Sequence, residues 1–600
     1  MNKGYVFMEM TNLWFTLLSC AFFMGLVGWI SYLKSKGDVS DSAGYFLAGR
    51  GLTGTFIAGS LLLTNLSAEQ LIGLNGQAYR ANLSNMAWEV TAGFAVVIMA
   101  LYLLPKYLGG AFTTLPGFLS SRYDEGVRRL SVLLFMLGYI LVTIPSVLYS
   151  GALAILKLFD VPAMLNISYA ESIWLIVWVV GIIGAIYAIF GGLKAVAISD
   201  TINGIGLLII GVLVPVLGFI TLGDGSFAEG VQKVVTANPE KLNAIGSSTD
   251  SVPFGTIFTG MILANLFYWG TNQYVIQRTL GAANLAEGQK GVLYSGFFKL
   301  AIPLFMMVPG LIAFQLYGEG MEPVDLAYPA LVAKVLPLYM SGFFLAVLLG
   351  AVLSSFNSLL NSAATMFALD IYKPLKKNAS DQELIRISKI FGTIIALVSF
   401  FISPMLMNAP DGLWDLIRRF TGFFNIPIIT IVLVGLLSKR IPALAAKVVI
   451  GFHVITYYML VWGLNQLFGV QVTINFIYIY AILFCIEVAI MMVIGKKRPM
   501  KVPYIFKSNA QVSLQPWKYS LLVTVTLLTL IVMTYIVFSP IGLAYGTSLV
   551  SPMFWPAMIA VTVIAVILGY FSINSWNIKY ARYLEKQQNK EIAKKHKKLA

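Results

Sequence analysis

The stretch Thr64-Asn65-Leu66-Ser67-Ala68-Glu69-Gln70 lies within residues 52–76, an otherwise apolar segment long enough to cross a membrane. Lipid cannot solvate a carboxylate or a carboxamide, so such side chains face a water-filled cavity, other polar groups or a ligand. Gly73 and Gly76 follow and would let the helix loosen. Broken helices of this kind build the midplane sites of secondary transporters. We therefore predict a binding site here, with helix packing as the alternative.

The composition predicts the class of protein. Of the 600 residues, 58% are hydrophobic and 11% are charged, which excludes an ordinary soluble globular protein. Apolar stretches of membrane-spanning length recur about fifteen times, so we predict an all-α polytopic membrane protein. Both cysteines fall in apolar spans, where they behave as small hydrophobic side chains. The predicted spans are 12–33, 52–76, 83–105, 128–158, 170–190, 194–221, 253–278, 290–317, 335–372, 384–407, 412–438, 441–467, 471–495, 517–539 and 552–575.

The positive charges behind the net charge of +15 are concentrated in the loops on one side of the predicted spans, which argues against a nucleic-acid partner. If the amino terminus is outside, the inward loops and the tail hold most of the 41 Lys and Arg residues. An odd number of spans then places the carboxyl terminus in the cytoplasm, and we expect a bacterial inner membrane. The inward segments are 34–51, 106–127, 279–289, 373–383, 496–516 and the basic tail from Lys579.

Glu89 and Lys299 are charged residues inside predicted spans, and each needs a partner. Glu89 needs a donor, either a neighbouring residue or substrate hydroxyls, and both alternatives stay open. Lys299 lies about 13 Å beyond Lys290 along the helix axis, so reaching the interface would strain its side chain. A buried lysine needs an acid, a carbonyl or a ligand oxygen, and Glu69 or Glu89 could supply the acid.

Residues 265–273 place aromatic and polar side chains beside a glycine, including Asn265, Tyr268 and Trp269. Rings with hydrogen-bonding groups are suited to a sugar or a similar polar ring. An interfacial aromatic belt is the alternative. The two aromatic residues lie roughly two to three turns from the inner boundary, a depth that favours a cavity.

Hydroxyl and carboxamide side chains recur along 354–365. Ser354, Ser358, Asn361 and Thr365 lie on one helical stripe, with Ser355 on its flank. Such oxygens suit a monovalent cation, whereas back-bonding to the helix is the alternative. Asp200 lies about two turns into another span, where a cation exit route, a second ion site or a salt bridge to Lys194 would each explain it.

The chain resembles the solute:sodium symporter family, close to bacterial sodium/galactose and mammalian sodium/glucose transporters. The resemblance implies a LeuT-like 5+5 inverted-repeat core with broken first helices. The motifs that carry it are Tyr45-Phe46-Leu47-Ala48-Gly49-Arg50, Asn65-Leu66-Ser67-Ala68-Glu69-Gln70, Tyr268-Trp269-Gly270 with Asn272-Gln273, Gln277-Arg278-Thr279-Leu280 and Asn361-Ser362-Ala363.

This resemblance divides the chain into six segments. They are 1–51 with an extra amino-terminal span and a cytoplasmic loop, 52–221 as the first repeat, 222–252 as an extracytoplasmic loop, 253–438 as the second repeat, 439–578 with additional spans, and 579–600 as a basic cytoplasmic tail.

The resemblance also implies where sodium and sugar bind. Sodium would bind the carbonyls of Leu63, Leu66 and Ala351 and the hydroxyls of Ser354 and Ser355, with Asp200 linked to cation release or a second sodium. Sugar would bind Asn65, Gln70, Glu89, Asn265 and Lys299, with Tyr268 as the inner gate and Leu74 and Trp414 as the outer gate. Glu69 matches no ligand position and is expected to pair locally.

Two positions depart from the family pattern, Ala92 and Arg418. A guanidinium recognises carboxylate, sulfate or phosphate better than neutral hydroxyls, so an anionic or derivatised sugar is an alternative substrate. A salt bridge from Arg418 to Asp415 on the same helix is the other explanation, and we favour it slightly.

The function expected from the resemblance is sodium-coupled uptake of a hexose such as galactose or glucose by alternating access, not enzymatic catalysis. A sodium symporter for another small organic solute and a transport-inactive membrane sensor are the alternatives. No ATP-binding loop of the G-x-x-x-x-G-K-[ST] kind occurs, so the ion gradient is the expected energy source.

Overall fold

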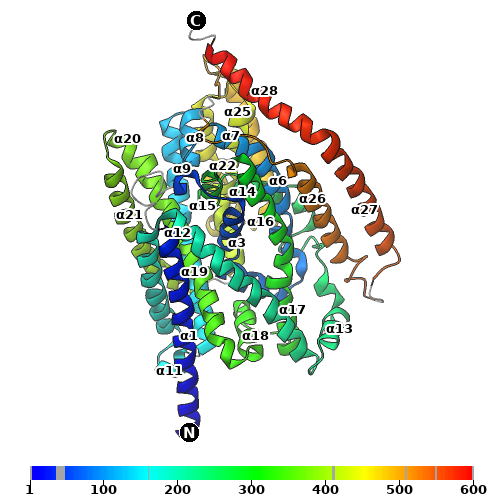
Figure 1. The fold of residues 1–600 in the computed structure, drawn as a ribbon. Helices are drawn as coiled ribbons and strands as arrows, with labels where there is room; N and C mark the ends of the chain where they lie inside the picture. Colours follow the sequence, from blue (N-terminus) through cyan, green and yellow to red (C-terminus); the bar gives the residue numbers. More distant parts are fainter. Residues whose placement is uncertain are drawn as a thin grey trace.

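The computed structural model describes residues 3–35, 47–159, 161–408, 413–506, 510–546 and 550–596. These ranges fold almost entirely into helices that pack side by side as one bundle (Figure 1). Helices α3 (Gly54–Asn65), α14 (Gly260–Gly270) and α15 (Gln273–Leu280) lie in the middle of the bundle, whereas α1 (Lys3–Ser35) and α27 (Phe554–Phe571) lie at its edges.

Twelve helical stretches of the described ranges are long and apolar enough to cross a membrane. The expected number of about fifteen is therefore not confirmed. Three expected spans are missing from the twelve: 52–76 and 253–278 are interrupted, and 170–190 lies in the first part of α12 (Tyr169–Leu222), where the apolar helix Tyr169–Ala185 is shorter. The twelve are Trp14–Leu33, Leu83–Gly109, Glu125–Leu156, Thr201–Leu222, Leu285–Tyr317, Leu338–Leu375, Asp381–Met407, Leu413–Leu437, Ala443–Phe468, Phe476–Lys497, Ser520–Val537 and Phe554–Lys586.

The first interrupted helix consists of α3 (Gly54–Asn65) and α4 (Ala68–Arg80). Leu66 and Ser67 between them leave the helical conformation, with φ/ψ of −89°/70° and −92°/162°. The carbonyls of the last turn of α3 and the N–H groups of the first turn of α4 therefore lose their intrahelical partners. The polar run identified in the sequence spans this break.

Gly73 and Gly76 do not form the break, contrary to the sequence-based expectation. Both lie inside α4, where they allow close packing. A Cβ atom at Gly73 would lie 2.9 Å from Trp414 Cβ, and one at Gly76 would lie 2.9 Å from the carbonyl oxygen of Val324. The glycines thus bring α4 against its neighbours, and the short polar run interrupts the helix.

The second interrupted helix consists of α14 (Gly260–Gly270) and α15 (Gln273–Leu280). Neighbouring segments hydrogen bond to the opened turn. Tyr107 donates its hydroxyl proton to the Gly270 carbonyl at 2.9 Å, and Tyr139 donates to Asn272 Oδ1 at 2.5 Å. The Leu115 N–H donates to Gln273 Oε1 at 2.9 Å. These bonds satisfy polar groups that lipid could not solvate.

A short parallel bridge joins the two interrupted helices. Leu52, just before α3, donates its N–H to the Gly281 carbonyl at 3.0 Å, and the Ala283 N–H donates to the Leu52 carbonyl at 3.0 Å. The start of α3 and the end of α15 are thereby held together through the main chain.

Polar side chains cap several long helices in the segments predicted to face the cytoplasm. Asp124 accepts from the Val127 N–H at 2.8 Å at the start of α9 (Glu125–Gly138). Asn284 caps α16 (Leu285–Met306) and Ser380 caps α21 (Asp381–Ile402) in the same way. These residue types satisfy the free N–H groups at the first turn of a helix.

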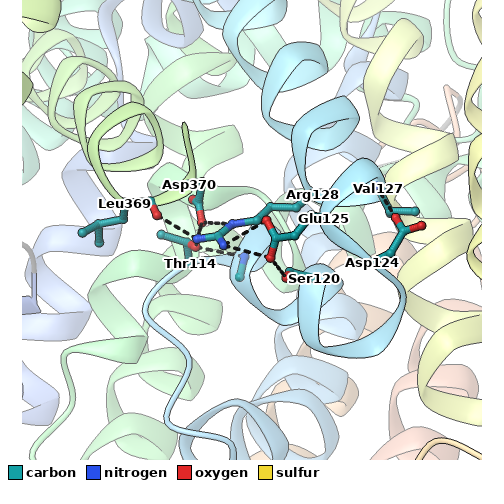
Figure 2. A network of polar contacts seen from close by, with 9 residues as sticks. Thr114, Ser120, Asp124, Glu125, Val127, Arg128, Leu369 and Asp370 are labelled. Carbon is teal, nitrogen blue, oxygen red and sulfur yellow. Dashed lines mark hydrogen bonds and ion pairs between the residues drawn. The ribbon is translucent and has the colours of Figure 1, made fainter. Parts of the chain in front are cut away.

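An ionic network ties α9 to the far end of α19 (Ser341–Met366), as Figure 2 shows. Asp370 lies in the helical continuation Phe367–Tyr372, and its side chain is fully buried. Its Oδ1 accepts from Arg128 Nε at 2.8 Å and from Thr114 Oγ1 at 2.9 Å. Arg128 also donates to the Leu369 carbonyl at 2.7 Å, so one guanidinium bonds both a side chain and the backbone of that segment.

Candidate functional site

A small cavity of about 60 Å³ lies beside both helix breaks. Its walls come from α4, α5 (Ala87–Val90), α14, α15 and α22 (Leu413–Leu437). Figure 1 places α14, α15 and α22 in the middle of the bundle. The polar and aromatic residues that line the cavity are Ser67, Glu69, Gln70, Trp88, Thr143, Phe267, Tyr268, Asn272, Tyr274, Trp414, Arg418, Thr421, Phe424 and Asn425.

Glu89 is the centre of a buried network next to this cavity. Its Oε1 accepts from Gln70 Nε2 at 3.0 Å, and its Oε2 accepts from the Lys299 ammonium. Both charged side chains are almost fully buried, at 1% and 4% exposure. Glu89 thus has the donor that the sequence required, and of the two acids considered for Lys299 it is Glu89 that pairs. The network joins α4, α5 and α16.

Arg418 does not pair with Asp415, which corrects the expectation that we favoured slightly. Asp415 Oδ2 accepts from Arg419 Nε at 2.5 Å, because the i,i+4 spacing brings these two side chains to one face of α22. Arg418 lies on the cavity wall, and its Nη2 is 3.9 Å from Glu89 Oε1. Its guanidinium carbon is 4.5 Å from the Trp88 ring centroid and 4.0 Å from that of Trp414.

Five polar atoms of cavity-lining side chains are buried without a hydrogen-bond partner among the residues that the structure describes. Three are acceptors and two are donors, so a ligand with hydroxyl groups could satisfy both kinds. The atoms are Glu69 Oε2, Gln70 Oε1, Asn425 Oδ1, Trp414 Nε1 and Arg418 Nε.

Asn65, Asn265 and Trp269 lie near the cavity but are not among the residues that line it. Asn65 donates to the Leu61 carbonyl at 2.7 Å, and its Oδ1 is buried without a partner in the described ranges. Asn265 donates to Thr91 Oγ1 at 3.0 Å. The Trp269 ring lies 5.7 Å from the Lys299 ammonium. The structure therefore places these three side chains behind the wall.

The predicted gates differ in position. Tyr268 lines the cavity and accepts a hydrogen bond from the Tyr274 hydroxyl at 2.8 Å. Trp414 also lines it, and it is the residue against which Gly73 packs closely. Leu74 is fully buried and is not a lining residue.

The predicted sodium ligands lie where the first helix break faces α19. This helix contacts both α3 and α4, and it carries Ala351, Ser354 and Ser355. Leu66 is the residue at the break, and its side chain is buried. Ser355 Oγ is buried with no hydrogen-bond partner in the described part of the chain. The side chains of Leu63 and Asp200 lie outside the described residues.

The rest of the serine stripe has another role. Arg278 Nη2 donates to Ser358 Oγ, and Ser362 Oγ donates to Gln277 Oε1 at 2.7 Å. Thr365 back-bonds to the Asn361 carbonyl at 2.6 Å, as the alternative interpretation of the stripe expected. Ser358, Ser362 and Thr365 therefore bind α15 or their own helix.

Among the lining residues that were not selected as ligands from the sequence are Glu69, Trp88 and Asn425. Glu69 hydrogen bonds locally to the Ser67 side chain, as expected, but its Oε2 has no partner in the described ranges and the residue also lines the cavity. Trp88 precedes Glu89 directly, and Asn425 lies two residues before a proline within an apolar span. A polar residue beside a proline in a span was the available signal for Asn425.

The chain is similar to several known proteins. A model of the Sodium:solute symporter family matches residues 45–451. The uncharacterized symporter YidK of Escherichia coli (strain K12) is 44% identical over 566 residues, which cover 94% of this chain and 97% of that protein. The sodium/glucose cotransporter of Vibrio parahaemolyticus is 31% identical over 444 residues, which cover 70% of this chain and 79% of that protein.

Among solved structures, the substrate-bound outward-open state of a Na+-coupled sialic acid symporter aligns with a TM-score of 0.69 at 20% identity. The alignment covers 81% of this chain and 99% of that chain. At this identity the likeness shows that the two chains share a fold.

Proposed function

Since the chain belongs to the sodium:solute symporter family, and is therefore a sodium-coupled membrane transporter of a small solute rather than an enzyme, we propose that its solute is a sugar, a hexose such as galactose or glucose. The observation that carries this proposal is the cavity beside both helix breaks. Aromatic rings from α5, α14, α15 and α22 line it together with five unsatisfied polar atoms. A hydroxylated ring offers apolar faces to aromatic side chains and both donors and acceptors at its edge.

In this proposal Gln70 contacts sugar hydroxyls through its free Oε1, while Glu89 and Lys299 hold Gln70 in place and compensate each other's charge. Asn65 and Asn265 would contact the sugar only after rearrangement, because both now bond to protein groups. Tyr268 below the ring and Trp414 with Leu74 above it would be the inner and outer gates.

Sodium is proposed to bind between the first helix break and α19. The carbonyls of Leu63 and Leu66 lie at a helix end, where they lack N–H partners along the helix. Ala351 would supply a third carbonyl, and Ser354 and Ser355 would supply hydroxyls. The unsatisfied Ser355 Oγ supports this assignment. Asp200 is proposed to act in cation release or at a second sodium site.

Transport would proceed by alternating access. Sodium orders α3 and α4 around the break and thereby forms the wall that carries Gln70. Sugar then binds, the outer gate closes, and displacement of Tyr268 opens the cavity inward. Coupling requires that sodium and sugar together stabilise the occluded state more than either does alone.

The proposal includes a LeuT-like core of two inverted five-helix repeats, residues 52–221 and 253–438, each of which begins with an interrupted helix. If the interrupted helices and the first part of α12 also cross the bilayer, the number of spans rises from twelve to the expected fifteen. The amino terminus would then be outside and the carboxyl terminus in the cytoplasm of a bacterial inner-membrane protein.

An anionic or derivatised sugar is the second candidate, and Arg418 favours it. This guanidinium lies on the cavity wall between two tryptophan rings, and its Nε is unsatisfied among the described groups. Because Asp415 pairs with Arg419, the acid nearest to the Arg418 guanidinium among the described residues is Glu89 at 3.9 Å, and the guanidinium is positioned to receive a ligand carboxylate.

Uptake of labelled D-galactose, D-glucose and D-galacturonate into proteoliposomes tests both candidates. We expect accumulation of a hexose with an inward sodium gradient and none with a potassium gradient. Accumulation of galacturonate alone would replace the first candidate by the second, and Arg418→Gln should then abolish it. Uptake of none of the three, with sodium still raising the unfolding temperature, would refute the sugar and favour another solute or a transport-inactive sensor.

A further inference from the structure

Helix α22 supplies much of the cavity wall and contains a proline in its interior. Trp414, Arg418 and Asn425 all precede Pro427. A proline within a helix removes one N–H donor and bends the helix at the preceding turn, here leaving the Phe423 carbonyl without its usual partner. The direction in which the cavity-lining half of α22 points therefore depends on what holds the helix around Pro427.

Two buried side chains hold α22 on both sides of this proline. His453 on α23 (Ala443–Tyr458) and Glu487 on α25 (Phe476–Lys497) are fully buried, and their Nδ1 and Oε1 atoms are 2.5 Å apart. His453 Nε2 bonds to the Gly422 carbonyl at 2.9 Å, before the proline. Thr430, after the proline, donates to Glu487 Oε2 at 2.7 Å.

The protonation of this pair follows from its partners. A carbonyl oxygen can only accept, so His453 Nε2 carries a proton and donates it to Gly422. The proton between Nδ1 and Oε1 then makes the pair either an imidazolium and a carboxylate or two neutral groups. In both cases the net charge is zero, as a membrane interior requires.

Two tyrosines of the same helices bond to the neighbouring turn of α22. Tyr457 donates to the Arg419 carbonyl at 2.7 Å, and Tyr480 donates to the Arg418 carbonyl at 2.6 Å. Gly422 makes this approach possible, since a Cβ atom there would lie 2.1 Å from the Tyr457 hydroxyl. Side chains of α23 and α25 thus bond to the backbone of the turn that carries Arg418.

We propose that His453 and Glu487 are positioning residues for solute binding: they bond α22 on both sides of Pro427 and thereby fix the part of the cavity wall that α22 forms. Neither residue lines the cavity, so they act through α22. The inference rests on the proposal that this cavity is the solute site. It gives α23 and α25, which follow the predicted second repeat, a specific task in transport.

The test compares Glu487→Leu, which breaks both hydrogen bonds, with Glu487→Gln and Met491→Leu. A glutamine can accept from Thr430 and donate to His453 Nδ1, so Glu487→Gln should behave like the unaltered protein. Met491 is also buried on α25, one turn further along, and its change to leucine conserves volume. All variants are compared at equal amounts of folded protein, judged by size-exclusion chromatography in detergent.

For Glu487→Leu we expect the KM for the best-transported sugar of the panel to rise about tenfold, within the usual range of coupling between sites. The sodium concentration for half-maximal uptake should change less than twofold. Hydrogen exchange of residues 418–430 should become faster in this variant and remain unchanged in Met491→Leu. If Glu487→Leu does not fold, Tyr480→Phe removes the bond to the Arg418 carbonyl and should raise KM in the same direction.

An unchanged KM and unchanged exchange in folded Glu487→Leu would overturn the inference. So would an equal rise in KM in Met491→Leu, which would point to general packing. If Gln70→Ala and Arg418→Gln also leave KM unchanged, the cavity itself is not the solute site and the proposed function fails first. If those two variants raise KM and Glu487→Leu does not, only the positioning role is refuted.

Discussion

Ser355 and Ser358 lie three residues apart on α19 and differ in their surroundings. Ser358 accepts from Arg278, whereas Ser355 Oγ is buried without a partner in the described ranges. A buried hydroxyl without a partner costs about 1–3 kcal/mol, so such a group in a native protein calls for an explanation. A bound cation would provide one for Ser355.

Replacement of Ser355 by alanine tests this explanation. Ser355→Ala should raise the sodium concentration for half-maximal uptake about tenfold, equivalent to about 1.4 kcal/mol of binding free energy. The measurement is uptake as a function of external sodium at constant ionic strength. The control is Ser388→Ala, because Ser388 is buried on α21 and donates to the Ile385 carbonyl of its own helix. Equal sodium activation in both variants would move the ion site elsewhere.

Sequence reasoning about single residues succeeded where the physical requirement had few solutions. Buried Glu89 and Lys299 each needed an opposite charge within a largely apolar chain, and they satisfy each other. It failed for Arg418, because Asp415 had two arginines within reach and only the packing of α22 decides which one pairs. Glu69 pairs locally with Ser67, as expected, but the sequence did not show that it also lines the cavity.

At the scale of elements, the polar run predicted an interrupted helix, and the structure confirms an interruption. The run spans the break, but the glycines that were expected to loosen the helix lie within α4. A glycine in a helix can provide flexibility or allow close packing, and the sequence does not distinguish these two roles. The position of the neighbouring helix does. At Gly73 that neighbour is Trp414.

Gly73→Ala should therefore impair transport through packing. The added methyl group would lie 2.9 Å from Trp414 Cβ, so α4 and α22 would have to separate at the predicted outer gate. Overpacking of this kind costs roughly 1–3 kcal/mol. We expect a several-fold lower maximal uptake rate with folded protein still present in the membrane. Gly451→Ala on α23 is the matched control, because a Cβ atom added there would point into open space with no neighbour within 4 Å, and it should leave uptake unchanged.

At the scale of the whole molecule, apolar length predicted most spans, because a bilayer imposes the same length on every helix that crosses it. Three expected spans are missing from the twelve because two of the helices are interrupted and one is merged into a longer helix. Contacts between distant segments could not be predicted. The charge of a loop indicates on which side of the membrane the loop lies, but it does not indicate which other segment the loop contacts. The pairing of Arg128 with Asp370 across 242 positions is such a contact.

A double-mutant cycle on this pair tests its contribution to the assembled bundle. Arg128→Met leaves the buried Asp370 carboxylate unpaired and should destabilise the protein by about 3–5 kcal/mol. Asp370→Asn combined with Arg128→Met should recover part of that loss, because an amide costs less to bury than a charge. The measurement is the midpoint of thermal unfolding in nanodiscs at one fixed heating rate. Additive effects of the two substitutions would show that the pair contributes no coupling energy.

The bridge between Leu52 and residues 281–283 uses only main-chain atoms. Related chains can therefore vary the side chain at position 52 freely among those that fit the buried space, but proline is excluded there and at position 283 because it has no N–H to donate. The same bridge couples the two interrupted helices mechanically. A displacement of the end of α15 is transmitted directly to the start of α3. Motion at one half of the molecule thus reaches the other without passing through the ligand.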